Sequence, residues 1–143
     1  MVRQQRGGYS LWLDDDRLLI VQRPQYTAET SLYLLDINVP EAEPELLTTQ
    51  TFVHDMQIAP GGGRIAFFRT FQDDPDDDGV YTLRTQVGAQ PVKQDFFGAY
   101  RWRDDRTLYT LSYDISTDVH ALGLAHAPTG DHRWLTDPDD VPI

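Results

Sequence analysis

An internal repeat constrains the fold of this chain more than any other feature. The segment WLDDDRLLIV (Trp12–Val21) returns without a gap as WRDDRTLYTL (Trp102–Leu111), ninety residues later. Halfway between them lies IAPGGGRIAF (Ile58–Phe67), in which Ile58 takes the Trp place and glycines fill the turn. Three copies of about 45 residues therefore fill the chain, and a period of this length indicates an array of one supersecondary unit.

Each copy contains four short apolar runs that alternate with polar residues and end at Gly, Asp or Pro, as strands do. No stretch shows helical spacing. We predict strands near 9–13, 17–22, 31–36 and 45–48, then 53–59, 64–70, 79–86 and 90–93, then 99–103, 106–112, 119–125 and 132–136. Four-stranded sheets at this period are typical of β-propeller blades. We expect an all-β, single propeller domain over 1–143 with three blades, at about 9–48, 53–93 and 99–136.

The composition agrees with a fold that has many turns and few helices. Of the 23 acidic residues, 19 are Asp, a poor helix former and a frequent turn residue. The net charge of −11 argues against nucleic acid and anionic membranes as partners, because both are bound mainly through Lys and Arg. The longest apolar runs have four residues, so we expect no membrane insertion.

Other classes of site are excluded by residue type. The chain has no cysteine, which excludes disulfides, thiolate metal sites and cysteine nucleophiles. No serine lies in a G-x-S-x-G turn, so we expect no serine hydrolase activity and no enzyme in this chain. The N-terminus lacks the apolar segment of a signal peptide. Two locations stay open: the cytoplasm, or the cell envelope if the signal is missing from this chain.

The repeat resembles that of the TolB-like, WD-type β-propeller family, which reads roughly W-S-P-D-G-x-x-I-A-F, then I-Y-x-x-D, and finally L-T. IAPGGGRIAF keeps Pro60, Gly62 and Ile65, the two outer copies keep Trp, and SLYLLD (Ser31–Asp36) matches the later part. The resemblance implies that Trp packs between blades and that Asp or Gly forms the turn. It also implies protein partners in the bacterial envelope, so we expect a non-catalytic scaffold for protein–protein interaction.

The number of copies is unusual for a propeller. Closed propellers contain about 4–8 blades, and this chain supplies three, which predicts a half-ring or a fragment of a larger propeller. We expect a homodimer in which two half-rings complete a six-bladed ring, because closure covers the exposed blade faces. The alternative is a propeller segment of a larger enzyme, such as a prolyl-oligopeptidase-type hydrolase, where it gates or positions substrate.

One loop suggests a cation. In QDDPDDDG (Gln72–Gly79), the residues Asp74, Asp76 and Asp78 precede Gly79 in the order of a calcium loop, D-x-D-x-D-G. Thr85 stands where an EF-hand places its bidentate Glu, so the ligand set is incomplete. The sequence therefore leaves two readings, a Ca²⁺ site or a solvated acidic hairpin tip, and it predicts no other cofactor.

The loops after the second strand of each copy are long and unlike one another, whereas the turns after the first strand are tight. Variable loops on a rigid scaffold usually carry binding. We predict an interaction face with aromatic anchors on this side, formed by Tyr26, Phe52, Phe71, Phe96 and Phe97. The alternative is that Phe52, Phe96 and Phe97 seal neighbouring blades.

Overall fold

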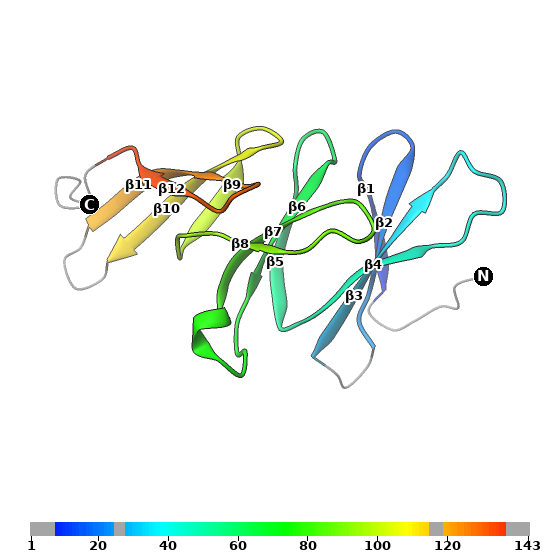
Figure 1. The fold of residues 1–143 in the computed structure, drawn as a ribbon, viewed down its shortest axis with the longest axis horizontal. Helices are drawn as coiled ribbons and strands as arrows, with labels where there is room; N and C mark the ends of the chain where they lie inside the picture. The colour runs from blue at the N-terminus through cyan, green and yellow to red at the C-terminus, as the bar shows by residue number, and fades with distance from the viewer. Residues whose placement is uncertain (1–7, 25–27, 115–118, 137–143) are drawn as a thin grey trace.

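The computed structural model describes residues 8–24, 28–114 and 119–136. They form three four-stranded antiparallel sheets that lie in a row (Figure 1). Blade 1 consists of β1 (Tyr9–Trp12), β2 (Arg17–Gln22), β3 (Glu29–Asp36) and β4 (Glu45–Thr51). Blade 2 consists of β5 (Val53–Ile58), β6 (Arg64–Arg69), β7 (Gly79–Arg84) and β8 (Val92–Lys93). Blade 3 consists of β9 (Ala99–Trp102), β10 (Thr107–Asp114), β11 (Val119–His126) and β12 (His132–Trp134).

The all-β prediction is confirmed, and each predicted strand is present within a few residues. Neighbours in sequence are neighbours in every sheet, so each blade is a meander. β3 and β4 extend further than expected, because Glu29 pairs with Thr51 beyond a register shift at Leu32/Tyr33. A short 3-10 helix, η1 (Pro75–Asp77), was not predicted.

Two of the three tight turns are built by an Asp side chain. Asp14 Oδ1 accepts hydrogen bonds from the backbone N–H of Asp16 at 3.0 Å and of Arg17 at 2.9 Å. Asp104 repeats the arrangement in blade 3, where its Oδ1 accepts from Arg106 and Thr107, both at 2.9 Å. These are Asx turns, which explains why Asp is abundant after the first strand of a copy.

Blade 2 uses glycine in the corresponding turn. Gly62 has φ +77°, a conformation that L side chains rarely adopt. A Cβ added there would lie 2.1 Å from the carbonyl oxygen of Leu13 in blade 1. The turn therefore needs glycine for its backbone conformation and for the close approach of two blades.

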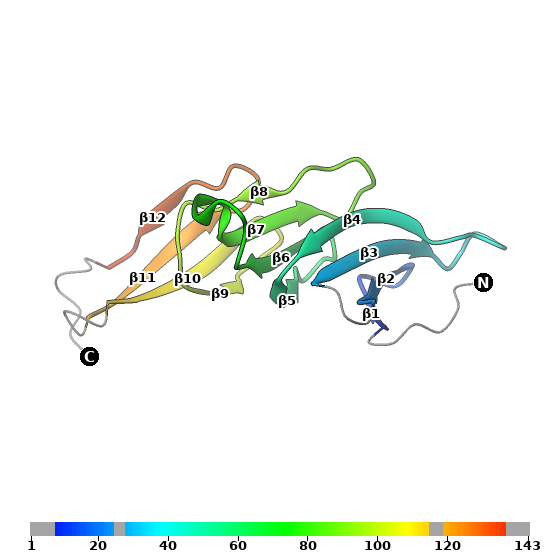
Figure 2. The ribbon, with the colours of Figure 1, turned by 90° about the horizontal axis from the view of Figure 1, so that it is seen from below.

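The hydrophobic core lies between neighbouring sheets, and Figure 2 shows these sheets along the row. One cluster joins blades 1 and 2, and it contains Leu13, Leu19, Val21, Leu32, Leu47, Ile65, Phe67, Tyr81 and Leu83. A second cluster joins blades 2 and 3, and it contains Ala59, Ala66, Val80, Tyr100, Trp102, Leu108, Ala125 and Ala127. Each sheet is thus stabilised mainly by its neighbour.

Polar bonds also cross the seam between blades 2 and 3, and each of the following joins a side chain of one of these blades to a backbone carbonyl of the other. Trp102 Nε1 donates to the Gln57 carbonyl at 3.0 Å. The Tyr100 hydroxyl donates to the Asp55 carbonyl, and burial raises the pKa of this phenol well above its ordinary value. Thr82 Oγ1 donates to the Ala127 carbonyl at 2.8 Å.

The two equivalent tryptophans differ in exposure. Trp102 is 9% exposed and packs between blades 2 and 3, as the sequence predicts. Trp12 is 60% exposed, because in the described part of the chain no blade lies in front of blade 1. No helix among the described residues is long and apolar enough to span a membrane.

Candidate functional site

The structure brings together two of the predicted aromatic anchors, Phe52 and Phe71. Phe52 joins β4 to β5, and Phe71 begins the loop between β6 and β7. Their rings meet edge to face with centroids 5.6 Å apart. Phe71 is 77% exposed and Phe52 is 44% exposed. The pair therefore forms an apolar projection on the loop side of the seam between blades 1 and 2.

The backbone of both phenylalanines lies in the left-handed region. Phe52 has φ 53° and Phe71 has φ 55°, values that are uncommon for bulky side chains. The Phe52 N–H donates to the Ala28 carbonyl at 3.0 Å, and the Thr70 N–H donates to the Phe52 carbonyl at 3.3 Å. Hydrogen bonds to two other loops thus hold the Phe52 backbone in place.

Gln72 fixes the loop that carries Phe71. Its Nε2 donates to the carbonyls of Thr51 at 2.9 Å and Thr70 at 3.0 Å. Its Oε1 accepts from the Arg69 guanidinium at 2.7 Å, and its backbone N–H donates to Asp78 Oδ1 at 2.9 Å. The aromatic pair is therefore presented by a loop whose polar groups are bonded to both blades.

The predicted calcium loop has carboxylates that bond to its own backbone. Asp74 Oδ1 accepts from the Asp76 N–H at 2.9 Å and so caps η1, while Asp78 accepts from Gln72. Among the described residues, no group of three or more His, Asp or Glu side chains is arranged to hold a metal ion. The calcium-loop prediction for Asp74, Asp76 and Asp78 therefore stays a prediction, and in the structure two of the three carboxylates accept backbone N–H bonds.

A second aromatic contact lies next to the first one. Phe97 is exposed and packs edge to face on Phe68, with centroids 5.1 Å apart. The His54 ring stacks on Phe68, with centroids 5.1 Å apart. His54 Nε2 is 3.4 Å from the hydroxyl of Thr70, the residue before Phe71. We call the five side chains of these two groups, Phe52, Phe71, His54, Phe68 and Phe97, the aromatic row; the contact between His54 and Thr70 links the two groups.

The remaining predicted anchors lie elsewhere. Phe96 is half-buried, stacks on His132 at 5.3 Å and packs against the second core cluster. It therefore seals blades 2 and 3, as the alternative reading expected. Tyr26 lies outside the described residues. Sequence reasoning missed His54 and Phe68, because both lie on strands and only their cross-strand pairing brings them to the loop side.

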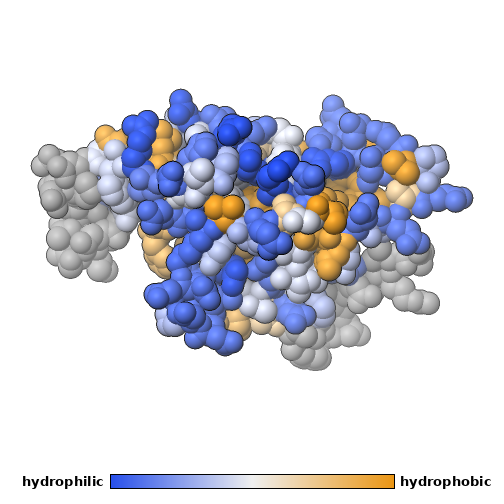
Figure 3. Space-filling model, in the orientation of Figure 1, coloured by the Kyte–Doolittle hydropathy of each residue, from blue (hydrophilic) through white to orange (hydrophobic). Residues whose placement is uncertain are grey.

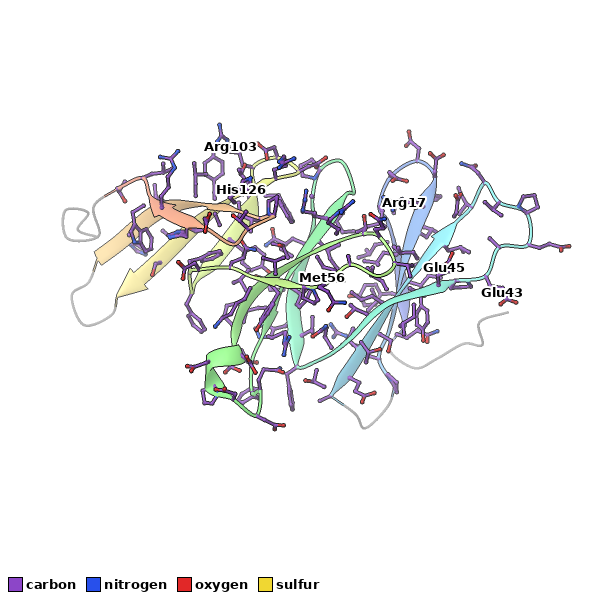
Figure 4. All side chains as sticks on the ribbon, viewed as in Figure 1. Arg17, Glu43, Glu45, Met56, Arg103 and His126 are labelled. Atoms are coloured by element: carbon purple, nitrogen blue, oxygen red, sulfur yellow. The ribbon has the colours of Figure 1, made fainter. Side chains whose placement is uncertain are left out.

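The histidines bond to threonine hydroxyls in ways that do not suggest catalysis. His132 Nε2 is 2.8 Å from Thr110 Oγ1, but Thr110 is buried, so a substrate has no access to this hydroxyl. Burial lowers the pKa of His132, although the charge of Asp95 acts in the opposite direction. His126 Nδ1 is 3.1 Å from Thr129 Oγ1 and lies near Arg103 at the edge of blade 3 (Figure 4). We interpret these pairs as structural.

A hollow beside the turn of blade 3 brings basic and acidic groups together. It is lined by Arg103, Arg106, His126, Asp104 and Asp105, among others. The carboxylates already have partners, since Asp105 Oδ1 accepts from the Gly61 N–H at 2.5 Å and Asp104 builds the turn. Figure 3 shows a largely hydrophilic surface in which hydrophobic residues form separate small groups. The aromatic row is therefore the stronger candidate site.

Comparison with known proteins adds one finding about the fold. No family model and no curated protein matches the sequence. Among solved structures, the chain is similar to the β-propeller domain of the Trilobed protease from Pyrococcus furiosus, which is described as having an open velcro topology. The TM-score is 0.53 at 10% identity, and the match covers 90% of this chain and 43% of the other. The chain spans less than half of the domain that it matches, and it has the fold of part of a β-propeller.

Proposed function

We propose that this chain is a non-catalytic, TolB-like β-propeller module that binds another protein through the aromatic row. One observation carries the proposal: Phe71 and Phe52 are exposed, packed against each other and held in the left-handed region of the backbone. Each such conformation costs on the order of 1–3 kcal/mol and is typical of ligand-binding and switch regions. Aromatic side chains, Phe among them, are also enriched at protein interfaces.

The rigidity of the loop favours binding as well. Gln72 bonds the loop to Thr51, Thr70 and Asp78, so little conformational freedom is lost when a partner binds. A preformed apolar projection suits a partner that offers a shallow apolar pocket.

The charge around the row restricts the chemistry of the partner. Phe71 is followed by an acidic loop in which Asp73, Asp74, Asp76 and Asp77 are exposed and Asp78 is half-buried. We therefore propose a partner segment in which apolar side chains meet Phe71 and Phe52 while Lys or Arg side chains lie beside the loop. Such complementarity adds specificity and speeds association.

A peptide selection tests this proposal directly. We would select a displayed peptide library on the chain and measure the affinity of the selected peptides by calorimetry. The expected consensus combines aromatic or aliphatic residues with Lys or Arg. Phe71→Ala should weaken binding by at least about tenfold, whereas Val87→Ala, also at an exposed apolar residue, should bind as the wild type does. Failure to select any peptide, or equal affinity for Phe71→Ala, would contradict the proposal.

A second candidate is a propeller segment of a larger enzyme. The observation that favours it is that the matched structure is a propeller domain of a protease. On this reading the aromatic row contacts substrate on its way to a catalytic domain encoded elsewhere. A hydrolase domain with a G-x-S-x-G turn in the reading frame downstream of Ile143 would support this alternative.

A further inference from the structure

The two ends of the row of blades carry apolar sheet faces. Side chains alternate between the two faces of a strand, and directly paired residues share a face. The face of blade 1 that points away from blade 2, the leading face, includes the apolar residues Trp12, Leu18, Ile20, Tyr33, Leu35 and Leu46. The face of blade 3 that points away from blade 2, the trailing face, includes Tyr109, Leu111, Leu122 and Leu124.

Blade 2 shows what normally happens to a leading face. Its registers Ile65↔Leu83 and Phe67↔Tyr81 correspond to Leu18↔Leu35 and Ile20↔Tyr33 in blade 1. In blade 2 these four side chains are buried under blade 1. In blade 1 the four equivalents are apolar as well, yet all of them are partly exposed. The leading face of blade 1 thus has the apolar residues of a buried blade face, but no other blade packs on it among the described residues.

Blade 1 likewise shows what normally happens to a trailing face. Leu19, Val21 and Leu32 are buried there by the leading face of blade 2. By register their equivalents in blade 3 are Tyr109, Leu111 and Leu122. Tyr109 and Leu122 are each 48% exposed. The trailing face of blade 3 therefore has apolar residues at the same register positions as the trailing face of blade 1, which packs on the leading face of blade 2.

The polar contacts of Trp102 provide a template for Trp12. Trp102 Nε1 donates to the carbonyl of Gln57 in blade 2. Gln57 precedes Ile58, which takes the place of Trp102 in the repeat of that blade. The residue of blade 3 that corresponds to Gln57 is Arg101, one place before Trp102. When blade 3 of a second chain lies against the leading face, its Arg101 carbonyl is therefore the equivalent acceptor for a hydrogen bond from Trp12 Nε1.

The charges of the two faces are complementary. Arg101 pairs with Tyr109 and Arg133 pairs with Leu124, which places both exposed arginines on the trailing face. Glu29 lies on the leading face by its alternation with Tyr33. Asp15 occupies the place of Asp105, whose carboxylate reaches the turn of the preceding blade. A trailing face against a leading face thus brings arginine toward carboxylate.

The two faces lie at opposite ends of the row and do not cover each other within one chain (Figures 1 and 2). We propose that two copies of this chain associate head to tail, with the leading face of each copy against the trailing face of the other. The two equal contacts close a ring of six blades, whereas a contact that does not close would produce filaments. The proposal concerns the end faces, so it is independent of any partner at the aromatic row.

The mass of the particle in solution tests the proposal. By light scattering after size exclusion at micromolar concentration, we expect twice 16.4 kDa. Trp12→Glu on the leading face and Leu122→Glu on the trailing face should each reduce the mass to 16.4 kDa. Val87→Glu, at an exposed residue on neither face, should keep the double mass. Circular dichroism and the urea midpoint show whether each variant is folded, and Leu46→Glu and Tyr109→Glu replace any variant that is not.

A mixing experiment distinguishes head-to-tail contact from contact between like faces. An equal mixture of Trp12→Glu and Leu122→Glu chains retains one intact contact, so the particle of double mass should return in part. Contact between two leading faces predicts instead that Leu122→Glu alone remains dimeric. A monomeric wild type, a dimer that survives both substitutions, or an open series of larger assemblies would overturn the proposal.

Discussion

Arg17 of blade 1 donates a hydrogen bond to the carbonyl of Thr85 in blade 2 at 2.7 Å (Figure 4). The same guanidinium donates to the Gly62 carbonyl at 3.3 Å and is oriented by Asp14 Oδ2 at 3.0 Å. Burial acts to raise the pKa of Asp14, but hydrogen bonds from Asp16 and Arg17 outweigh it, and the pKa is lowered. Arg17, which follows the tight turn of blade 1, thus donates hydrogen bonds to two backbone carbonyls of blade 2.

We expect Arg17→Ala to destabilise the chain by about 1–3 kcal/mol, because it leaves two seam carbonyls without this donor. The measurement is the urea midpoint followed by tryptophan fluorescence. Arg23→Ala is the matched control, since Arg23 is exposed at the end of β2, and it should unfold at the wild-type midpoint. Equal urea midpoints for the wild type, Arg17→Ala and Arg23→Ala would show that the hydrogen bonds of Arg17 contribute nothing to stability.

Adjacent glycines in the turn of blade 2 should respond in opposite directions to alanine. Gly62→Ala places a Cβ against the Leu13 carbonyl at a positive φ, so we expect a loss of more than about 1 kcal/mol. Gly63 has no atom within 4 Å of an added Cβ, and Gly63→Ala should be neutral or gain up to about 1 kcal/mol. Thermal unfolding of both variants checks this. A tolerated Gly62→Ala would mean that the blades do not approach as closely as described.

Stability should fall in mild acid because of His132. Burial sets the pKa of His132 below its ordinary value of 6.5, which the unfolded chain has. The folded state therefore favours the neutral ring, and its stabilising effect is present above pH 6.5 and is lost as pH falls through the lower, folded value. Between about pH 7 and pH 5, the free energy of unfolding should decrease less in His132→Gln than in the wild type. Identical pH profiles would contradict this assignment, and an NMR titration of the ring measures the pKa itself.

The acidic loop should depend on Asp78 and not on Asp73. Asp78 Oδ1 accepts from the Gln72 N–H at 2.9 Å, whereas Asp73 is exposed. We expect Asp78→Ala to accelerate hydrogen exchange of the Gln72 amide and Asp73→Ala to leave it unchanged. Equal protection in the two variants would show that the loop is held by other contacts.

Much of the fold could be predicted because its determinants are local. Strand alternation and turn residues such as Asp14, Asp104 and Gly62 act within a few residues, so the repeat indicates every sheet. Exposure of Trp12 could not be read in the same way, since it depends on the blade that neighbours it rather than on its own segment.

The candidate site was less predictable for the same physical reason. Phe52 and Phe71 are recognisable as loop aromatics, but their positive φ values and mutual contact depend on bonds across a seam. His54 joins the row beside a register shift in β5, which no sequence pattern indicates. The carboxylate spacing at Asp74 and Asp78 predicts calcium, but spacing does not reveal that these side chains also accept hydrogen bonds from the backbone.

The seams between blades have a consequence for how such a chain can evolve. Arg17, Trp102, Tyr100 and Thr82 all bond across a seam to main-chain carbonyls, which every residue type supplies. These four bonds therefore depend on the backbone shape of the neighbouring blade and not on its side chains. Duplication or loss of the coding segment for a whole blade leaves these bonds available at the new junction. The side-chain packing of the two core clusters, in contrast, has to match at each border.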